Sequence, residues 1–507
     1  MARKNLLRIH ALLVPPALAL MASGLRAGDW PQYRGPNHDG TSTETIRTNW
    51  SEAPPRQLWK VPLDPALSSF AIAGGKAFTQ VRRRLGNGDQ EFCIALNAET
   101  GQELWATPLG KADYPHGGVG PDDGPRSTPS VDGDRVYVLT SYLRMACLDA
   151  TTGQVVWSKD LVAQYGGTVI LWQNAASPLI VGDLIYMNCN AANQRLLALR
   201  KQDGSEAWKG QNDPMTQSTP VAATIAGVAQ IIFFAQSGLV SVTPETGAVL
   251  WRYPFAYSTS TAASPVVGDD VVYCSAAYGV GAGAVRISGA APGLVATEVW
   301  RTPGDNMNHW ATPVHHDGYF YGIYGQSSTS LRCIELATAT EKWRQAGVGY
   351  GSVLFVNGYV LMLTEPGDLV LVNPDPSAYT EVDRFKAVTG KCWNVPAISN
   401  GRIYVRSTTE AACLDVAPKA LPALKLLPSL AADKGGLRLL IVNEDASPVD
   451  ANRVTNIDVF ATFDLAVGSS NWTRLAQPYV LTNGQLRLDD PTGLNAPQRF
   501  FRAAERR

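Results

Sequence analysis

The sequence lacks an excess of charge of either sign. Charged side chains make up 17% of the 507 residues, and 43 lysines and arginines are balanced by 44 aspartates and glutamates, giving a net charge of −1. A protein that holds a nucleic-acid backbone needs a positive field, so this balance argues against a nucleic-acid partner. With 45% apolar residues, the chain has the composition of a globular protein rather than a disordered one.

The sequence also lacks an apolar run long enough to span a membrane, which takes ~20 residues. The longest candidate, Ala11–Ala22, is short and contains two prolines. It follows three basic residues and precedes several small ones, the order typical of a secretory signal. We therefore predict that residues 1–27 are a signal peptide, in preference to a membrane anchor. The mature chain is expected in the periplasm, outside the cell or at its surface, with no integral membrane segment.

Familiar catalytic and metal-binding motifs are absent. The sequence contains no Cys-x-x-Cys, His-Glu-x-x-His, Gly-x-Ser-x-Gly or phosphate-loop pattern. The adjacent histidines His315 and His316 fall at an expected hairpin, where their side chains would point to opposite faces of a strand. The pattern Gly279–Gly283 resembles a dinucleotide loop, but no helix-forming stretch follows it, so we interpret it as a mobile loop. No metal site is predicted.

What the sequence does contain is a repeat of about 40–45 residues, the length of one propeller blade. The clearest copy runs from Ser127 through Leu148–Gly153 to Trp157, and it reads Ser/Thr-Pro, two strands around a Gly/Asp turn, Leu-Asp-Ala-x-Thr-Gly, then tryptophan. The turn pairs are typical of tight hairpins, so each copy predicts four strands. The last strand of each copy carries a large aromatic residue: Trp59, Trp105, Trp157, Trp208, Trp251, Trp300, Trp343 and Phe385.

The count of outer strands predicts an all-β fold, an eight-bladed β-propeller. The first outer strand, with Trp59, precedes any complete copy, and the last copy, at residues 396–416, lacks an outer strand. We expect the two to pair and close the ring, which protects the sheet edges. The predicted organisation is a signal peptide at 1–27, an N-terminal segment at 28–57, the propeller at 58–416, a linker at 417–435 and a small β-rich module at 436–507.

Cysteine occurs seven times, an odd number, so at least one thiol is unpaired. Three cysteines share one position of the repeat, which other copies fill with alanine or serine, as at Ala95 and Ser241. A position that accepts these residues requires a small side chain, so we interpret Cys147, Cys333 and Cys413 as core residues.

The repeat phrase resembles that of a known family, the PQQ-like (quinoprotein-type) propellers. The closer resemblance is to secreted bacterial members, and it rests on Asp29–Asn37, Asp123–Pro129, His309–Val314 and Gly390–Trp393. Quinoprotein dehydrogenases share this ring, as does the propeller lipoprotein of the outer-membrane β-barrel assembly machinery. The resemblance covers roughly residues 28–416 and implies the fold, whereas the activities of such proteins differ.

Candidate site residues lie in the connections from each outer strand to the next inner strand, which reach one face of the ring around its channel. Two of these connections are long, a feature often linked to function. The first holds Tyr114, His116, Asp122, Asp123 and Arg126, and the second holds Tyr165, Trp172, Gln173 and Asn174. The predicted ligand-binding residues are Arg126, Gln217, His309, Trp310, Lys391 and Trp393. The alternative is that these side chains only pack the loops.

The sequence is compatible with three functions. The preferred one is a non-catalytic binding or scaffold propeller whose partner is an envelope protein or a glycan. The resemblance implies a second, an alcohol or sugar dehydrogenase that uses pyrroloquinoline quinone (PQQ) and calcium. It would take Asp122 or Asp123 as base, Trp310 or Trp393 as the floor under the quinone and Arg126 near its oxygens. The third is a polysaccharide-binding propeller.

Overall fold

The computed structural model describes residues 28–114, 123–290, 292–418, 422–430, 437–463, 471–476, 478–490 and 499–506. The chain divides into two compact units, Met1–Pro418 and Lys419–Arg507. The predicted signal peptide, His116 and Asp122 lie outside the described residues. In the described part of the chain, no helix is both long and apolar enough to cross a membrane.

The described strands of the first unit form eight antiparallel sheets, here called blades 1–8 in chain order. Blades 1 and 2 comprise β3 Ala71–Ala73, β4 Lys76–Leu85, β5 Gly88–Asn97, β6 Glu103–Lys111, β7 Ser130–Asp132, β8 Arg135–Leu139, β9 Arg144–Asp149 and β10 Val155–Asp160. Blades 3 and 4 comprise β11 Leu179–Val181, β12 Leu184–Asn188, β13 Leu196–Arg200, β14 Glu206–Gly210, β15 Val221–Ile225, β16 Val228–Ala235, β17 Gly238–Val242 and β18 Val249–Pro254. Blades 5 and 6 comprise β19 Val266–Gly268, β20 Val271–Ala276, β21 Gly281–Ser288, β22 Val295–Thr302, β23 Val314–His316, β24 Tyr319–Tyr324, β25 Ser330–Glu335 and β26 Glu341–Ala346. Blades 7 and 8 comprise β27 Ser352–Val356, β28 Tyr359–Leu363, β29 Asp368–Val372, β30 Glu381–Lys386, β31 Ala397–Ser399, β32 Arg402–Arg406, β33 Glu410–Asp415 and β2 Arg56–Pro62, with β1 Thr41–Ser42 added parallel to β27.

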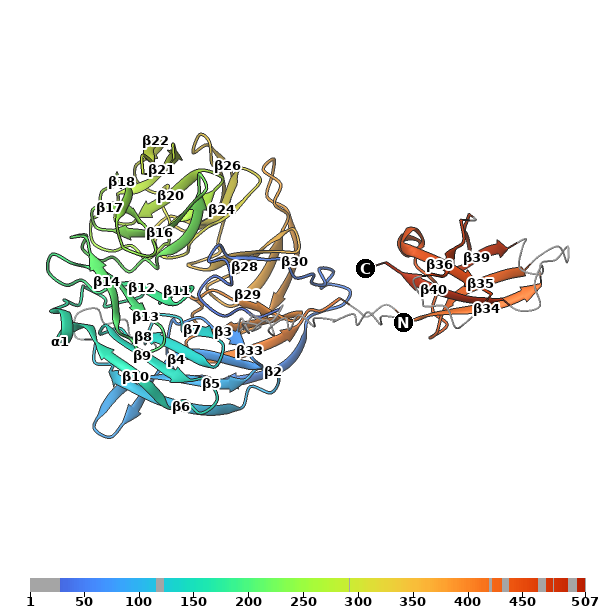
Figure 1. Ribbon diagram of the computed structural model, residues 1–507, viewed down its shortest axis with the longest axis horizontal. Helices are drawn as coiled ribbons and strands as arrows, with labels where there is room; N and C mark the ends of the chain where they lie inside the picture. The colour runs from blue at the N-terminus through green and yellow to red at the C-terminus, as the bar shows by residue number, and fades with distance from the viewer. Residues whose placement is uncertain are drawn as a thin grey trace, which may run out of the picture. The chain divides into compact units, whose positions relative to one another are not determined.

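The blades follow one another round a ring, and the ring is closed as the sequence predicts. In Figure 1 the colours run round the ring from blue to orange, and β33 lies beside β2. The two strands pair antiparallel, with Trp59 opposite Cys413. The prediction of an all-β propeller closed by an N-terminal strand is therefore confirmed.

Six of the seven repeat tryptophans donate a hydrogen bond to the next blade, whereas Trp251 donates to Gln230 of its own blade. The indole Nε1 of Trp59, in blade 8, donates to the carbonyl oxygen of Ala98 in blade 1 at 3.0 Å, and Trp105 of blade 1 does the same to Ala150 of blade 2 at 3.3 Å. The glycine of the next blade's Thr-Gly turn lies against the indole ring of the tryptophan. A Cβ on Gly101 would be 2.8 Å from Trp59 Cδ2. Gly101 has φ +74°, so both its conformation and its space require glycine.

The apolar core lies between neighbouring blades. One cluster, for example, combines Ala71, Phe78 and Cys93 of blade 1 with Val136 and Leu148 of blade 2. All seven cysteines are free and buried. The interpretation of the repeat cysteines as core residues agrees with this placement.

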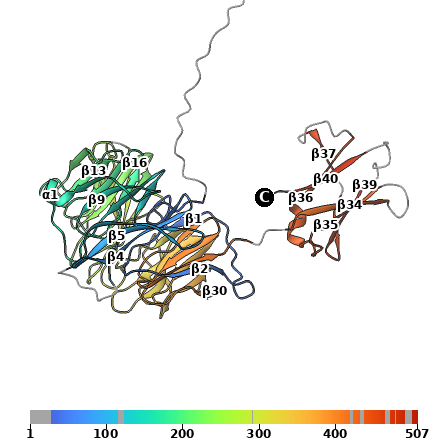
Figure 2. The ribbon, with the colours of Figure 1, turned by 90° about the horizontal axis from the view of Figure 1, so that it is seen from below.

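Two local features differ from the sequence interpretation. The long connection between blades 2 and 3 begins with a short helix, α1 Leu161–Tyr165, which lies at the outer edge of the ring in Figure 1 and Figure 2. Its start is capped by Asp160, whose side chain accepts from the Ala163 N–H at 3.0 Å. The interpretation of Gly279–Gly283 as a mobile loop is wrong at its end, because β21 begins at Gly281 and a Cβ on Gly283 would meet Phe255 Cε2 at 2.7 Å.

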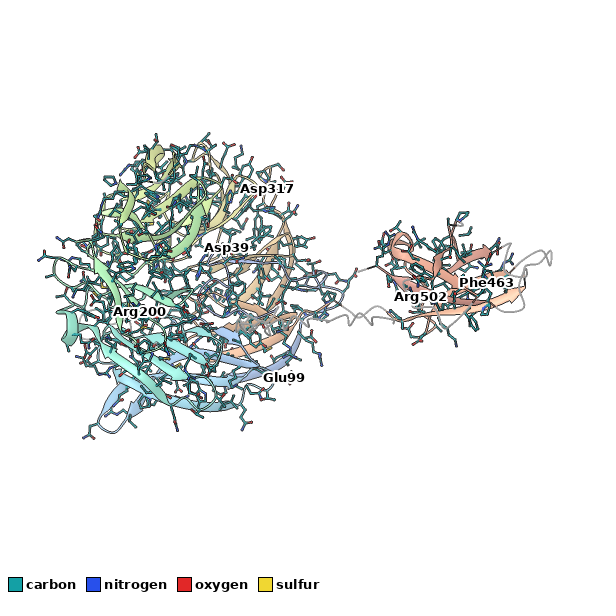
Figure 3. The ribbon with its side chains drawn as sticks, in the orientation of Figure 1. Asp39, Glu99, Arg200, Asp317, Phe463 and Arg502 are labelled. Carbon is teal, nitrogen blue, oxygen red and sulfur yellow. The ribbon has the colours of Figure 1, made fainter. Side chains whose placement is uncertain are left out.

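The second unit is a small β module. Its elements are β34 Leu424–Leu430, β35 Leu437–Asn443, the 3-10 helix η1 Ala451–Asn456, β36 Ile457–Thr462, β37 Thr473–Arg474, β38 Val480–Thr482, β39 Gln485–Asp490 and β40 Phe500–Glu505. The prediction of a linker over 417–435 is wrong in part, because β34 pairs with β35 along its whole length. In this module the guanidinium of Arg502, labelled in Figure 3, lies 5.4 Å from the ring centroid of Trp472.

Candidate functional site

A cavity of about 430 Å³ lies at the end of the channel where the chain enters each innermost strand. Every blade contributes to it. The lining residues are Leu67 and Ser69 before β3, Arg126 before β7, Trp172 and Ala175 before β11, Gln217 and Thr219 before β15, Ser260 and Ala262 before β19, Tyr278 after β20, His309, Trp310 and Ala311 before β23, Gln326 and Ser327 after β24, Tyr350 before β27 and Ser352 at its start, Trp393, Asn394 and Val395 before β31, and Tyr33. The volume falls within the ~300–1,000 Å³ typical of small-ligand sites.

The N-terminal segment crosses the channel beneath this cavity. The carbonyl oxygen of Pro31 accepts from the Val131 N–H of blade 2, at 2.7 Å. Three residues later, the buried guanidinium of Arg34 donates to the carbonyl oxygens of Thr312 and Pro313, ahead of blade 6, at 2.9 and 2.8 Å. Blades 2 and 6 lie on opposite sides of an eight-sheet ring, so the segment spans the axis. Figure 3 labels Asp39 of this segment within the outline of the ring.

The same segment is fixed at both ends by strand-like contacts. Trp30 forms an antiparallel bridge with Ile72 of β3, and β1 pairs with β27. These partners lie within the innermost strands, whereas most of the cavity lining comes just before those strands. The segment therefore lies deeper in the channel than the cavity, and Tyr33 is the residue it contributes to the lining.

A continuous row of aromatic rings lines the cavity from blade 3 to blade 8. Trp172 stacks on Tyr278 with ring centroids 5.9 Å apart and planes 12° from parallel, and Tyr278 meets His309 edge-on at 5.1 Å. His309 contacts Trp310 at 4.4 Å, and Trp310 contacts Trp393 at 4.6 Å. Such a row offers a broad apolar surface with a polar edge.

Arg126 and Asp123 form an ion pair at the edge of the cavity. Arg126 Nη2 lies 2.7 Å from Asp123 Oδ2, and Arg126 Nη1 donates to the Trp172 carbonyl oxygen at 2.9 Å. The Asp123 side chain is only 1% exposed, and its other oxygen accepts from the Gly124 N–H at 2.7 Å. Burial raises the pKa of Asp123, and the Arg126 guanidinium opposes that rise. Asp123 is thus a buried partner of Arg126 and does not line the cavity.

Gln217 and Lys391 have structural contacts of different kinds. The side-chain amide of Gln217 donates to the Leu171 carbonyl oxygen at 2.8 Å, and its oxygen accepts from the Ser260 hydroxyl at 3.1 Å. The Lys391 ammonium lies 4.7 Å from the ring centroid of Trp393. Lys391 is therefore next to the aromatic row but is not one of the residues that line the cavity.

Several buried polar atoms of the lining have no hydrogen-bond partner within the described residues. They are both side-chain amide atoms of Asn394, the indole Nε1 of Trp310 and Nδ1 of His309. The contrast with Trp393 is direct, because its Nε1 donates to Glu365 at 2.8 Å. Asn394 is 2% exposed. A buried, unpaired polar group costs about 1–3 kcal/mol, so these atoms are the part of the lining where a further hydrogen-bond partner would be stabilising.

The structure thus brings five of the predicted ligand-binding residues to one cavity: Arg126, Gln217, His309, Trp310 and Trp393. Tyr165, also named from the second long connection, lies away from it in α1, where the Lys209 ammonium is 5.2 Å from its ring centroid. Sequence reasoning missed Asn394, although it directly follows Trp393. It also missed Tyr33, Tyr278 and Tyr350, of which the first two come from segments that no repeat position links to the channel.

The cavity does not fit a calcium-dependent quinone. None of the described residues that line it is an aspartate or a glutamate. In the described part of the chain, no group of three or more His, Cys, Asp or Glu side chains is arranged to hold a metal ion. Calcium requires several oxygen ligands, usually including carboxylates, and the described lining contains no carboxylate. Asp123, a candidate base, forms an ion pair with Arg126.

Fold and cavity define a quinoprotein-type repeat propeller, open at its loop face and crossed below by its own N-terminal segment. Residues 88–345, slightly more than half of the sequence, match the family described as outer membrane protein assembly factor BamB, and the chain belongs to this family. It is 24% identical to the BamB of Moranella endobia over 292 residues, 54% of this chain and 69% of that protein. It is 26% identical to the BamB of Yersinia pestis over 205 residues, 36% of this chain and 47% of that protein.

Solved structures show the same fold. The crystal structure of BamB from Moraxella catarrhalis matches with a TM-score of 0.50 at 14% identity, covering 72% of this chain and 98% of that one. A quinohemoprotein alcohol dehydrogenase from Comamonas testosteroni matches with a TM-score of 0.54 at 11% identity, covering 81% and 84%. At these identities the likeness concerns the fold alone.

Proposed function

We infer that the chain is an exported, non-catalytic binding propeller of the cell envelope, which holds a ligand in the axial cavity at its loop face. The observation that carries this proposal is the cavity itself, with its row of aromatic rings and the unpaired polar atoms of Asn394, Trp310 and His309. Aromatic walls with a few convergent polar groups are characteristic of ligand sites.

The location and the scaffold role draw on two further observations. Residues 1–27 have the order of a secretory signal, which supports export. The relatives are described as outer membrane protein assembly factors, which supports a role as a platform for other envelope components. An envelope protein bound at the loop face is part of this proposal.

The residues that line the cavity do not favour the dehydrogenase alternative. The described cavity lining offers no carboxylate to bind calcium or to accept a proton, and Asp123, a candidate base, is paired with Arg126. The axial position of the cavity and its aromatic lining are compatible with both functions.

The proposal is tested by native mass spectrometry of the purified chain after incubation with an enzymatic digest of cell envelopes. We expect bound species on the native protein and their loss from the Trp310→Ala/Trp393→Ala variant, because that variant removes the two rings at one end of the aromatic row. Tyr165→Ala is the matched control, since this ring lies in α1, away from the cavity. Identical spectra for native protein and cavity variant would contradict the proposal.

A parallel assay addresses catalysis. The chain is incubated with PQQ, Ca²⁺, alcohols or sugars and an electron-accepting dye. We expect no dye reduction above that of the Trp310→Ala/Trp393→Ala variant. Turnover by the native protein alone would replace the binding role with an enzymatic one.

A further inference from the structure

We propose that the axial cavity binds a neutral saccharide, a ligand class that rests on the binding role inferred above. Three properties of the cavity lead to it: which hydrogen-bonding atoms are unpaired, the absence of net charge in the lining, and the aromatic surface beside them.

The unpaired atoms include donors and acceptors side by side. Within the described residues, the side chain of Asn394 has an unpaired N–H₂ donor and an unpaired carbonyl acceptor, and the Trp310 indole has an unpaired donor. An anion would satisfy the donors and leave the Asn394 oxygen unpaired and buried. A hydroxyl group is both a donor and an acceptor, so neighbouring hydroxyls can satisfy the whole set. Adjacent hydroxyl groups are the defining feature of a sugar ring.

The charged groups around the lining are of both signs: the Lys391 ammonium lies 4.7 Å from the Trp393 ring centroid, and Glu365 accepts from the Trp393 Nε1 at 2.8 Å. The charge of Arg126 is balanced by Asp123 at 2.7 Å. Burial lowers the pKa of His309 to about 4, so its ring is neutral at pH 7. No acid is found among the described lining residues. Desolvating a charged ligand here would lack compensation, whereas an uncharged one carries no such cost.

The aromatic surface and the closed lower end favour a sugar over a peptide. The flat C–H face of a sugar ring packs on an aromatic ring while its hydroxyls reach the surrounding polar atoms. An extended peptide needs a groove or a free sheet edge, and the chain ends of a peptide carry charge. The cavity is instead a pit, closed below by the segment that contains Tyr33 and Arg34.

The test uses the whole chain labelled with 5-fluorotryptophan, with the Trp310 resonance assigned from Trp310→Phe. The probes are neutral pentasaccharides of glucose, xylose, mannose and N-acetylglucosamine, a uronic acid pentasaccharide, PQQ with Ca²⁺, and a capped neutral pentapeptide. Affinities are measured by calorimetry. The variants are Asn394→Ala, Asn394→Asp and Trp310→Phe, which remove one or two of the unpaired atoms. Asn373→Ala, at an exposed position after β29, is the matched control.

We expect at least one neutral pentasaccharide to shift the Trp310 resonance. Its affinity should fall about 10-fold in each Asn394 variant and about 2- to 10-fold in Trp310→Phe, the range of one lost hydrogen bond. Asn373→Ala should leave it unchanged. If the uronate, the quinone or the peptide shifts Trp310 and no neutral saccharide does, the saccharide assignment is wrong while the binding role stands. If no probe shifts Trp310, the saccharide assignment is again wrong, and the mass-spectrometric comparison decides the binding role separately.

Discussion

The contact between a repeat tryptophan and the turn glycine of the next blade makes a quantitative prediction for Gly101→Ala. The new methyl group would lie 2.8 Å from Trp59 Cδ2, well inside the ~3.5–4.0 Å of an ordinary carbon contact. The residue would also have to keep φ at +74°. The left-handed conformation costs about 1–2 kcal/mol and overpacking about 1–3 kcal/mol. We therefore expect the free energy of unfolding to fall by about 2–5 kcal/mol.

Gly74→Ala separates the two contributions. Gly74 has φ +55°, and a Cβ there meets no atom within 4 Å, so only the conformational cost of about 1–2 kcal/mol applies. Both variants are measured by urea denaturation followed by tryptophan fluorescence and circular dichroism. Gly101→Ala should cost less in a Trp59→Phe background than in the native protein, because the smaller ring leaves room for the methyl group. Equal destabilisation by Gly74→Ala and Gly101→Ala would refute the role assigned to the Trp59 contact.

Three further predictions follow from burial. Because all seven thiols are buried and burial raises the pKa of Cys147 to about 11, a thiol reagent at pH 8 should label the protein only after denaturation. Burial also lowers the pKa of His309 to about 4, below its unfolded value of ~6.5, so protons bind the unfolded chain preferentially between these values. Stability should therefore fall as pH drops from about 6.5 to about 4, and less steeply in His309→Gln, as measured by thermal melts. Arg34→Met leaves the Thr312 and Pro313 carbonyl oxygens without their donor, and should expose the N-terminal segment to limited proteolysis while the remaining propeller resists.

The features that the sequence predicted are those that each repeat encodes locally. The Thr-Gly turn and the tryptophan four residues later recur in successive copies. Each copy therefore predicts the same contact with the neighbouring blade. Closure of the ring could be predicted by counting outer strands. The strand with Trp59 belonged to no complete copy, and the last blade had no outer strand of its own. His309, Trp310 and Trp393 could be placed at the channel because they immediately precede an innermost strand.

The rest depends on contacts between distant segments that no local pattern encodes. Arg34 donates to Thr312, 278 positions away, and nothing in the residues around Arg34 indicates that partner. Tyr278 reaches the cavity from the hairpin between β20 and β21, which lies at the cavity end of the blade but is not one of the predicted outer-to-inner connections. The strand β34 was missed because its leucines are interrupted by Lys425 and Pro428, which obscures the alternation of a strand.

The segment that carries Arg34 makes the channel a blind well with a single entrance. A polymer cannot thread through the ring, and an internal stretch of a long chain cannot reach Asn394 without folding back on itself. If the ligand proposed above is part of a polymer, it enters this well by a chain end. The number of termini, and not the total mass of polymer, then sets how many protein molecules a polymer sample binds.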